Sequence, residues 1–256
     1  LLGDTVALKI LHPRLTSNPE VVERFLRESE VLTHLRHPHI VRLEEKGRAD
    51  NLYFMAMEYV PGKNLHEILA TASAPLSCSH VISMAVQVLD ALHCAHVNGV
   101  IHRDIKPGNI LFLPNTGEIK VADFGIAYLL SHAEESTALT GRETLLGTES
   151  YMAPEQREAP DQVDERADLF SLGVVMYVAL TRRYPKGVFP PPSHWQPEAA
   201  LLLDKIVLKA LEHDPAGRFA SAEDFKLHLL GGGEPRAKGQ RFLRWLKKKK
   251  PADPSS

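Results

Sequence analysis

The chain has 256 residues, which is enough for one large domain or for two lobes that share a buried core. Hydrophobic residues make up 44% and charged residues 24%, as in ordinary globular proteins. A formal net charge of −2 excludes the strongly basic footprint of a nucleic-acid-binding protein, so we expect no nucleic acid among the partners.

The sequence gives few signs of a membrane span, a targeting segment or disulfide bonds. No uninterrupted apolar run reaches the ~18 residues of a membrane span. The first residues, from Leu1 onward, read as the middle of a domain, and we expect the N-terminus to be cut. Cys78 and Cys94 have no metal-binding spacing, and we interpret them as reduced core thiols, which fits a cytoplasmic protein.

Hydrophobic periodicity divides the chain into strands first and helices later. Period-two alternation predicts strands and a 3.6-residue period predicts helices, with breaks at Pro61-Gly62 and Gly99. The predicted strands are 5–11, 40–43, 52–59, 110–113 and 119–122, and the predicted helices are 18–35, 79–98, 168–180, 201–211 and 222–230. Residues 126–150 lack periodicity and are predicted to form a long loop, which in a compact domain is usually functional.

This order of elements indicates an α+β architecture in two lobes that join near residues 58–62. We place the boundaries at 1–60 for a small β-rich lobe, 61–230 for a larger helical lobe and 231–256 for a basic, flexible tail. A small ligand is expected to bind between the lobes.

Two motifs carry the chemistry, residues 102–109 (HRDIKPGN) and Asp123-Phe124-Gly125. Phosphoryl transfer needs a phosphate and a hydroxyl held in line, with the phosphate charge neutralised. Asp104 is placed to accept the hydroxyl proton, a contribution of typically ~10²–10⁴-fold. Asn109 and Asp123 supply the hard oxygen ligands that Mg²⁺ prefers. Lys106 can reach the transferred phosphate as a point charge.

These motifs resemble those of the protein kinase family. Four further pieces in the family's order agree: Val6-Ala7-Leu8-Lys9, residues 24–28 (RFLRE), Ala153-Pro154-Glu155 and residues 168–173 (DLFSLG). The resemblance implies a two-lobed kinase-like fold that uses ATP and Mg²⁺, with Lys9 holding the α- and β-phosphates, Glu28 pairing with Lys9, and Asp168 bracing the catalytic loop.

The resemblance also assigns residues to the adenine. Met57 takes the gatekeeper position, Glu58 and Val60 would offer backbone groups, and Ala7 and Leu111 would sandwich the ring. The alternative for all of them is plain core packing. A buried structural ion pair between Arg218 and Glu155 is implied as well.

The kind of kinase follows from local patterns. Lys106 two residues after Asp104 is similar to the serine/threonine class, as is the segment 147–155, where Thr148 would contact both of these residues. Residues 34–41 and 206–211 are similar to bacterial-type kinases. The implied substrates are therefore serine and threonine hydroxyls of proteins.

An arginine before the catalytic aspartate, here Arg103, binds a phosphorylated activation loop in this family. We therefore expect autophosphorylation, with a homodimer for the reaction in trans. The candidate acceptors are Ser136, Thr137, Thr140 and Thr144, which otherwise are merely polar loop residues.

Two departures leave alternatives open. No Gly-rich loop precedes Val6, and the segment after Thr181 is shorter than the family's docking region. A pseudokinase-like binding or scaffold module is the main rival reading, and a small-molecule kinase is a third. The lysines 247–250 could contact anionic headgroups at about 1 kcal/mol per charge, as in the cytoplasmic domain of a membrane-anchored kinase, or belong to a solvated linker.

Overall fold

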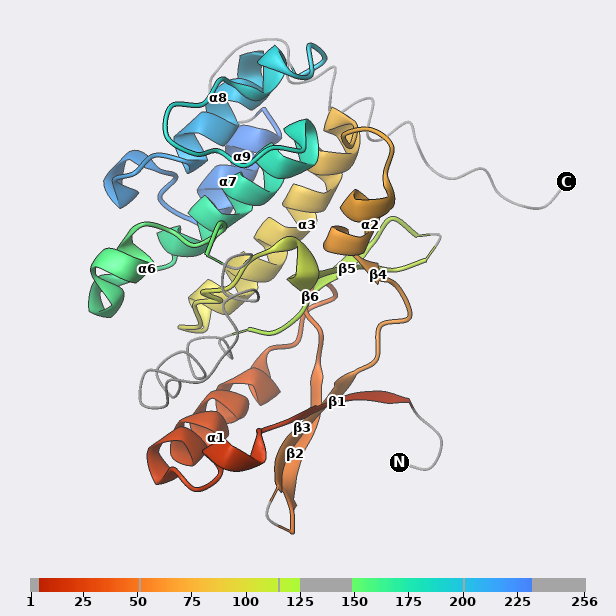
Figure 1. Cartoon of the computed structure of the whole chain (residues 1–256), viewed down its shortest axis with the longest axis vertical. Helices are drawn as coiled ribbons and strands as arrows, with labels where there is room; N and C mark the ends of the chain where they lie inside the picture. Colours follow the sequence, from red (N-terminus) through yellow and green to blue (C-terminus); the bar gives the residue numbers. More distant parts are fainter. Residues whose placement is uncertain (1–4, 51, 115, 125–148, 200, 232–256) are drawn as a thin grey trace, which may run out of the picture.

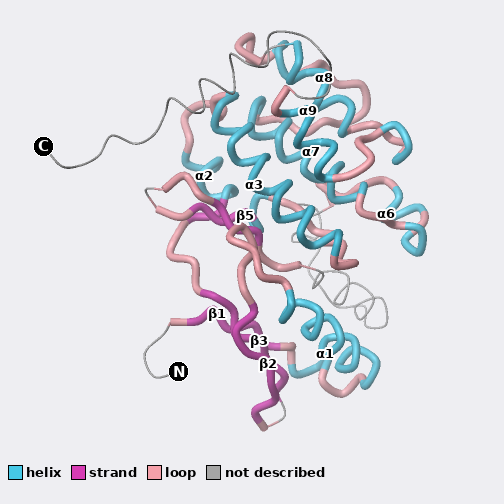
Figure 2. Tube along the Cα trace, turned by 180° about the vertical axis from the view of Figure 1, so that it is seen from behind, coloured by secondary structure: helices cyan, strands magenta, loops and turns pink. Residues whose placement is uncertain are grey.

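The computed structural model describes residues 5–50, 52–114, 116–124, 149–199 and 201–231. Two lobes are arranged one above the other, and both views show a β-sheet with helix α1 (Pro19–His34) in the first and a bundle of helices in the second (Figure 1, Figure 2). We call them the N-lobe and the C-lobe. The described residues therefore have the two-lobed α+β architecture that the sequence predicts.

The N-lobe sheet consists of β1 (Val6–Ile10), β2 (Leu43–Ala49) and β3 (Leu52–Glu58), all antiparallel in the order β1-β3-β2. Along β1 the side chains alternate between exposed and partly buried, as a strand with one covered face requires. Helix α1 (Pro19–His34) is capped by Asn18, whose side chain accepts a hydrogen bond from the backbone N–H of Glu20, the second helical residue. Its apolar face packs on the sheet in a small separate core.

The strand predicted at 40–43 is wrong. Ile40 forms an isolated parallel bridge with Val121, and the backbone N–H of Val41 donates to the Val121 carbonyl, so this segment joins the N-lobe to the C-lobe. The real strand β2 starts at Leu43 and is polar and mostly exposed. It lacks the apolar alternation that a half-buried strand shows, because its stability comes from the ladder with β3.

A second sheet links the lobes and contains β4 (Lys63–Asn64), β5 (Ile110–Phe112) and β6 (Ile119–Val121). The chain crosses into it at Gly62, where a Cβ would lie 1.8 Å from the carbonyl oxygen of Phe112, so only glycine fits. Helix α2 (Leu65–Thr71) follows at once and is started by a capping box of Asn64 and Glu67. Neither β4 nor α2 was predicted.

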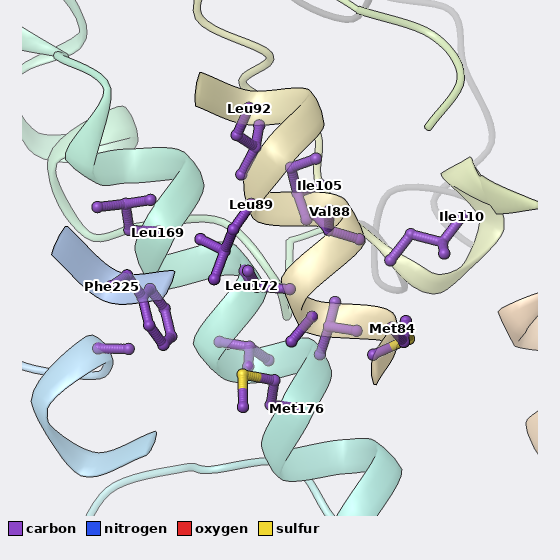
Figure 3. Close-up of a cluster of buried hydrophobic side chains, with 14 of the residues drawn as sticks. Met84, Val88, Leu89, Leu92, Ile105, Ile110, Leu169, Leu172, Met176 and Phe225 are labelled. Carbon is purple, nitrogen blue, oxygen red and sulfur yellow. The ribbon is translucent and has the colours of Figure 1, made fainter. Parts of the chain in front are cut away.

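The C-lobe core lies between α3 (Cys78–Val97), α7 (Arg166–Thr181) and α9 (Ala222–Leu229). Figure 3 shows Leu89 and Leu92 of α3 facing Leu169 and Leu172 of α7, with Phe225 closing one side. Helix α7 is buried nearly all round, which places it at the centre of the lobe. The remaining helices within the described residues are α6 (Glu155–Glu158), α8 (Leu201–Ala210) and 3₁₀ turns at Pro13–Leu15, Pro107–Asn109, Pro160–Gln162, Pro192–His194 and Pro215–Gly217.

By length and hydropathy alone, α3 passes as a membrane-crossing helix among the described residues. Its residues Val81, Ala85, Val88 and Leu92 are fully buried in the C-lobe core. A central core helix has the same composition, and the packing supports that interpretation.

Candidate active site

The loop between α3 and β5 gathers the residues predicted to carry out phosphoryl transfer. The Lys106 Nζ lies 2.7 Å from the Asp104 Oδ2. The Asn109 side-chain amide donates to the Asp104 carbonyl oxygen at 2.8 Å and to its Oδ2 at 3.0 Å. A proline at the start of the 3₁₀ turn Pro107–Asn109 fixes the backbone between them. The predicted base, the predicted phosphate cation and one predicted metal ligand therefore form a single cluster.

The buried carboxylate of Asp168 stabilises this loop. Asp168, in the first turn of α7, is 1% exposed and accepts the backbone N–H groups of His102 and Arg103, both at 2.8 Å. The His96 Nε2 lies 2.8 Å from the same carboxylate. Arg103 has a left-handed backbone with φ 63°, a conformation that costs free energy and persists where surrounding contacts impose it. The predicted bracing role of Asp168 is confirmed.

The N-lobe reaches the same region through Lys9, a β1 residue that is one of the two partly buried positions of its strand. Its Nζ lies 3.0 Å from the Oδ1 of Asp123, which follows β6 and has a φ of 63°. Both side chains keep about a third of their surface accessible, at 29% and 36%. The Phe124 ring packs at a tilt against the His102 ring, with 4.5 Å between centroids, which ties the Asp123 segment to the loop that holds Asp104.

The Asp123 segment is also fixed by backbone contacts. The Ala122 N–H donates to the Asn109 carbonyl at 2.9 Å, and the His102 Nε2 lies 2.9 Å from the Ala122 carbonyl. Asn109 and Asp123 are thus held on neighbouring segments.

The chemistry of this donor set fits Mg²⁺. The Asn109 side-chain nitrogen donates to Asp104, so its side-chain oxygen is not used in these hydrogen bonds and is available as a metal ligand. Among the described residues no cluster of three or more His, Cys, Asp or Glu side chains could hold a metal by itself. Mg²⁺ commonly takes one or two protein oxygens and completes its shell with water and substrate phosphates, and Asn109 with Asp123 offers that number.

The residues assigned to the adenine lie where the lobes meet. Met57 stands opposite Ala7 in the β1–β3 ladder and lines a small apolar pocket with Leu32, Leu35, Ile40, Val41, Leu43, Asp123 and Phe124. Leu111, on β5, is partly buried. Their contact with a nucleotide stays a prediction.

Glu58 and Val60, whose backbone groups are predicted to contact the adenine, already make hydrogen bonds within the protein. The Glu58 N–H donates to the Arg42 carbonyl at 2.8 Å, and its carboxylate lies 3.0 Å from the Lys120 Nζ. The Val60 carbonyl accepts from the Gly62 N–H at 2.8 Å. The assignment of Glu58 and Val60 to the adenine therefore also stays a prediction.

Several predicted residues lie outside the part that is described. Glu28 belongs to α1, as predicted, but its side chain is not described. Thr148 and the candidate acceptors Ser136, Thr137, Thr140 and Thr144 are outside as well, together with the tail from residue 232.

The predicted ion pair between Glu155 and Arg218 is present. The guanidinium donates to both carboxylate oxygens, at 2.6 and 2.8 Å, and the Arg218 side chain is fully buried. Such a bidentate pair in a dry site fixes geometry as well as charge. It anchors α6, which directly follows residues 149–154.

Sequence reasoning missed Gln156. Its side-chain oxygen accepts the Ala153 N–H at 3.0 Å, and its amide donates to the Arg103 carbonyl at 2.8 Å. The described residues just before α6 are thereby tied to Arg103, the residue before Asp104. A glutamine directly after the Ala153-Pro154-Glu155 motif was the available signal, and it is a weak one.

Comparison with known proteins decides the family. The chain matches the protein kinase domain over residues 2–220. It belongs to the protein kinase family. The kinase is 39% identical over 248 residues to the serine/threonine-protein kinase pkn3 of Myxococcus xanthus, covering 89% of this chain and 45% of that protein. It is 35% identical to PrkC of Bacillus subtilis over 243 residues, covering 90% of this chain and 36% of that protein.

A solved structure agrees. The PknI kinase domain of Mycobacterium tuberculosis superposes with a TM-score of 0.70 at 31% identity, with 89% of this chain and 85% of that one covered. The bacterial-type kinase resemblance and the two-lobed fold are confirmed. The chain spans less than half the length of these two curated relatives.

Proposed function

We propose that this kinase domain transfers the γ-phosphate of ATP to serine and threonine hydroxyls of proteins. Relatives named as serine/threonine-protein kinases align with about nine-tenths of the chain and support that class. The observation that carries the proposal is the cluster at Asp104, where Lys106 lies at 2.7 Å and Asn109 at 3.0 Å on a loop braced by Asp168.

The roles follow from charge and position. Asp104 accepts the proton of the attacking hydroxyl, whose oxygen forms the new bond to the γ-phosphorus while the bond from that phosphorus to the β–γ bridging oxygen breaks and ADP leaves. Lys106, beside Asp104, places a positive charge where the transferred phosphoryl group passes. Mg²⁺, when bound, would neutralise phosphate charge, and Asn109 and Asp123 are the residues that would hold it.

Lys9 and Asp123 neutralise one another in this structure, at 3.0 Å. We expect nucleotide binding to exchange that contact, so that Lys9 turns to the phosphates and Asp123 becomes available as a ligand. Both partners are partly exposed, so breaking the pair costs on the order of 1 kcal/mol or less. The cost is small beside the affinity of a nucleotide bound at micromolar concentration, about 8 kcal/mol.

Phosphoamino-acid analysis tests the class of acceptor. Wild type and Lys9→Ala are incubated with γ-labelled ATP, Mg²⁺ and an unstructured protein that carries serine, threonine and tyrosine. We expect label in phosphoserine and phosphothreonine for wild type and a large loss for Lys9→Ala. Label confined to phosphotyrosine, or equal label with both proteins, would refute the proposal. A scaffold module would transfer none, and no comparison favours that alternative.

Regulation and location are further parts of the proposal. Arg103 is placed beside Asp104 and, by family resemblance, would bind a phosphorylated residue of 126–150, with Thr140 and Thr144 as first candidates in a homodimer. Mass spectrometry after incubation with ATP tests it, and active enzyme without modification there would contradict it. A cytoplasmic domain near a membrane is tested by liposome co-sedimentation with and without the last twenty residues. Equal binding would exclude a role for the basic tail.

A further inference from the structure

The peptide group between Arg103 and Asp104 is held at both of its ends. Its carbonyl oxygen, that of Arg103, accepts a hydrogen bond from the Gln156 side-chain amide at 2.8 Å. Its N–H, that of Asp104, donates to the Nδ1 of the His102 ring at 3.2 Å. A peptide group is planar, so two contacts on opposite edges fix the direction of the whole plane. This plane leads directly into the Cα of Asp104, and its direction therefore sets where the carboxylate points.

The preceding peptide group is held by a different element. The N–H of Arg103 donates at 2.8 Å to the Oδ1 of Asp168, in the first turn of α7. Arg103 thus lies between two fixed planes, and its φ of 63° is a left-handed conformation that costs free energy in a residue with a side chain. Relaxation of this φ would turn one plane against the other. Because the first plane is bound to Asp168, the plane that would turn is the one that carries Asp104.

Gln156 is itself held by the residues just before it. Its Oε1 accepts the N–H of fully buried Ala153 at 3.0 Å, and its backbone N–H donates to the Ala153 carbonyl at 3.1 Å. Only one orientation of the amide fits, because the Ala153 N–H needs an acceptor and the Arg103 carbonyl needs a donor. The adjacent residue, Glu155, is fixed by its two hydrogen bonds to Arg218. The amide therefore reaches Arg103 from a rigid base.

We propose that Gln156 is a positioning residue for phosphate transfer, whose amide keeps the peptide plane before Asp104 in the direction that presents the carboxylate to the substrate hydroxyl. The inference rests on the proposed function, because it adds a residue to the same site. Gln156 acts through the Arg103 carbonyl and not on the reacting atoms. The loss of one hydrogen bond to a carbonyl that stays in place sets the scale, so kcat should fall by about 5- to 30-fold without it.

The two contacts of Gln156 determine the variants. Gln156→Glu keeps an oxygen for the Ala153 N–H, but its ionised form sets a second oxygen against the Arg103 carbonyl, where two acceptors repel each other. Its protonated form regains a donor. Gln156→Met has a similar length and can make neither contact. Gln162→Glu is the matched control, because Gln162 is exposed in the next 3₁₀ turn and undergoes the same chemical change outside these contacts.

Transfer from γ-labelled ATP to a serine peptide gives kcat and KM of each variant between about pH 5.5 and pH 8, as ratios to wild type at the same pH. For Gln156→Met we expect the lower kcat at every pH, with a smaller change in KM. For Gln156→Glu we expect a similar loss near pH 8 and a recovery of about twofold or more at the acid end, as the carboxyl takes up a proton. Gln162→Glu should follow wild type throughout. A merely structural role would lower the melting temperature of both Gln156 variants without a pH-dependent recovery of kcat.

Hydrogen exchange at the Asp104 N–H provides a readout that needs no activity. It is measured by mass spectrometry of overlapping fragments. Exchange should be faster in Gln156→Met than in wild type, by a factor similar to the loss in kcat, because the peptide plane is then held at its N–H end only. Exchange in the buried helix α3 should be the same in both proteins, which shows that the change is local.

The two readouts keep this inference separate from the proposed function. An active wild type with an unchanged kcat in Gln156→Met, or with one kcat ratio for Gln156→Glu at every pH, would overturn the positioning role and leave the kinase activity standing. Faster exchange in Gln156→Met together with no transfer by wild type would support the positioning role and refute the activity. Equal exchange together with no transfer by wild type would refute both.

Discussion

Replacing Arg218 with alanine should destabilise this kinase domain more than any surface change. The guanidinium makes five hydrogen bonds, two of them to the Glu155 carboxylate and three to the carbonyls of Glu212, Arg166 and His213, at 2.8, 3.0 and 3.0 Å. Its side chain is fully buried, and that of Glu155 is 13% exposed. Arg218→Ala therefore leaves a nearly buried carboxylate and three carbonyls without their donor.

The magnitude follows from these contacts. Removing one partner of a buried pair costs about 3–5 kcal/mol. Carbonyls that lose a donor add to that, so we expect about 4–6 kcal/mol for Arg218→Ala, a large part of the 5–15 kcal/mol that stabilises a typical domain. Glu155→Ala should cost less, about 2–3 kcal/mol, because the arginine keeps its three carbonyl acceptors and water can enter the space of the carboxylate.

Urea denaturation at 25 °C, followed by circular dichroism, measures these free energies of unfolding. Arg218→Lys keeps the charge but cannot make the bidentate contact, and should fall between wild type and Arg218→Ala. The double variant Arg218→Met/Glu155→Leu should recover part of the loss, with a coupling energy of about 2 kcal/mol or more. A cost under ~1 kcal/mol for Arg218→Ala, or additive effects in the double variant, would refute the reasoning.

Three further predictions concern the catalytic loop, the linker and acid stability. Asp168→Asn places a donating amide group where a carboxylate oxygen accepts a backbone N–H, so one of these hydrogen bonds is lost. The free energy of unfolding, measured by urea denaturation, should fall by about 1–3 kcal/mol, and kcat should fall more than KM rises. An unchanged kcat would contradict the bracing role. Gly62→Ala forces a methyl group against the Phe112 carbonyl oxygen and should lower the melting temperature by several degrees, whereas Gly108→Ala, where a Cβ meets nothing, should not. Burial, and then His39, lower the pKa of His37, so the unfolded chain binds this proton more tightly. Stability should therefore fall as the pH drops below the ordinary histidine pKa of 6.5, and His37→Gln should flatten that fall in urea midpoints between pH 7 and 5; parallel curves would contradict it.

Hydrophobic periodicity predicted the elements that bury an apolar face in the core, because the buried face is visible in the spacing of their own apolar residues. The strand with Lys9 has its alternating pattern because one face is covered, and α7 reads as a continuous apolar run because it is buried on every side. Strand β2 was not predicted because its side chains are polar. It is held by its hydrogen bonds to β3, which starts nine residues after the start of β2. No local apolar signal records that pairing.

The candidate catalytic residues were predictable for a different reason. Asp104, Lys106 and Asn109 lie within six residues, so one short motif carries their geometry. The contact of Gln156 with Arg103 joins segments 53 residues apart, and that of Tyr184 with Tyr151 joins segments 33 residues apart, and no spacing rule relates them. What could not be predicted is therefore the placement of one segment on another.

The same distinction explains the Asp168 contacts. A buried aspartate in an apolar helix indicates a polar partner. The partners, the N–H groups of His102 and Arg103, lie 66 and 65 residues away, and the family resemblance rather than the helix pattern pointed to them.

The rate of phosphate transfer by Asp104→Asn tests the central claim most directly. Asparagine keeps the shape and can still accept hydrogen bonds from Asn109, but it cannot take the hydroxyl proton. We predict that kcat for transfer from γ-labelled ATP to protein falls by about 10²–10⁴-fold. The affinity for ATP, measured by calorimetry, should change less than about threefold because Asp104 bonds Lys106 and Asn109 and not Lys9, the residue that we propose holds the phosphates. Transfer at the wild-type rate by Asp104→Asn would contradict the account.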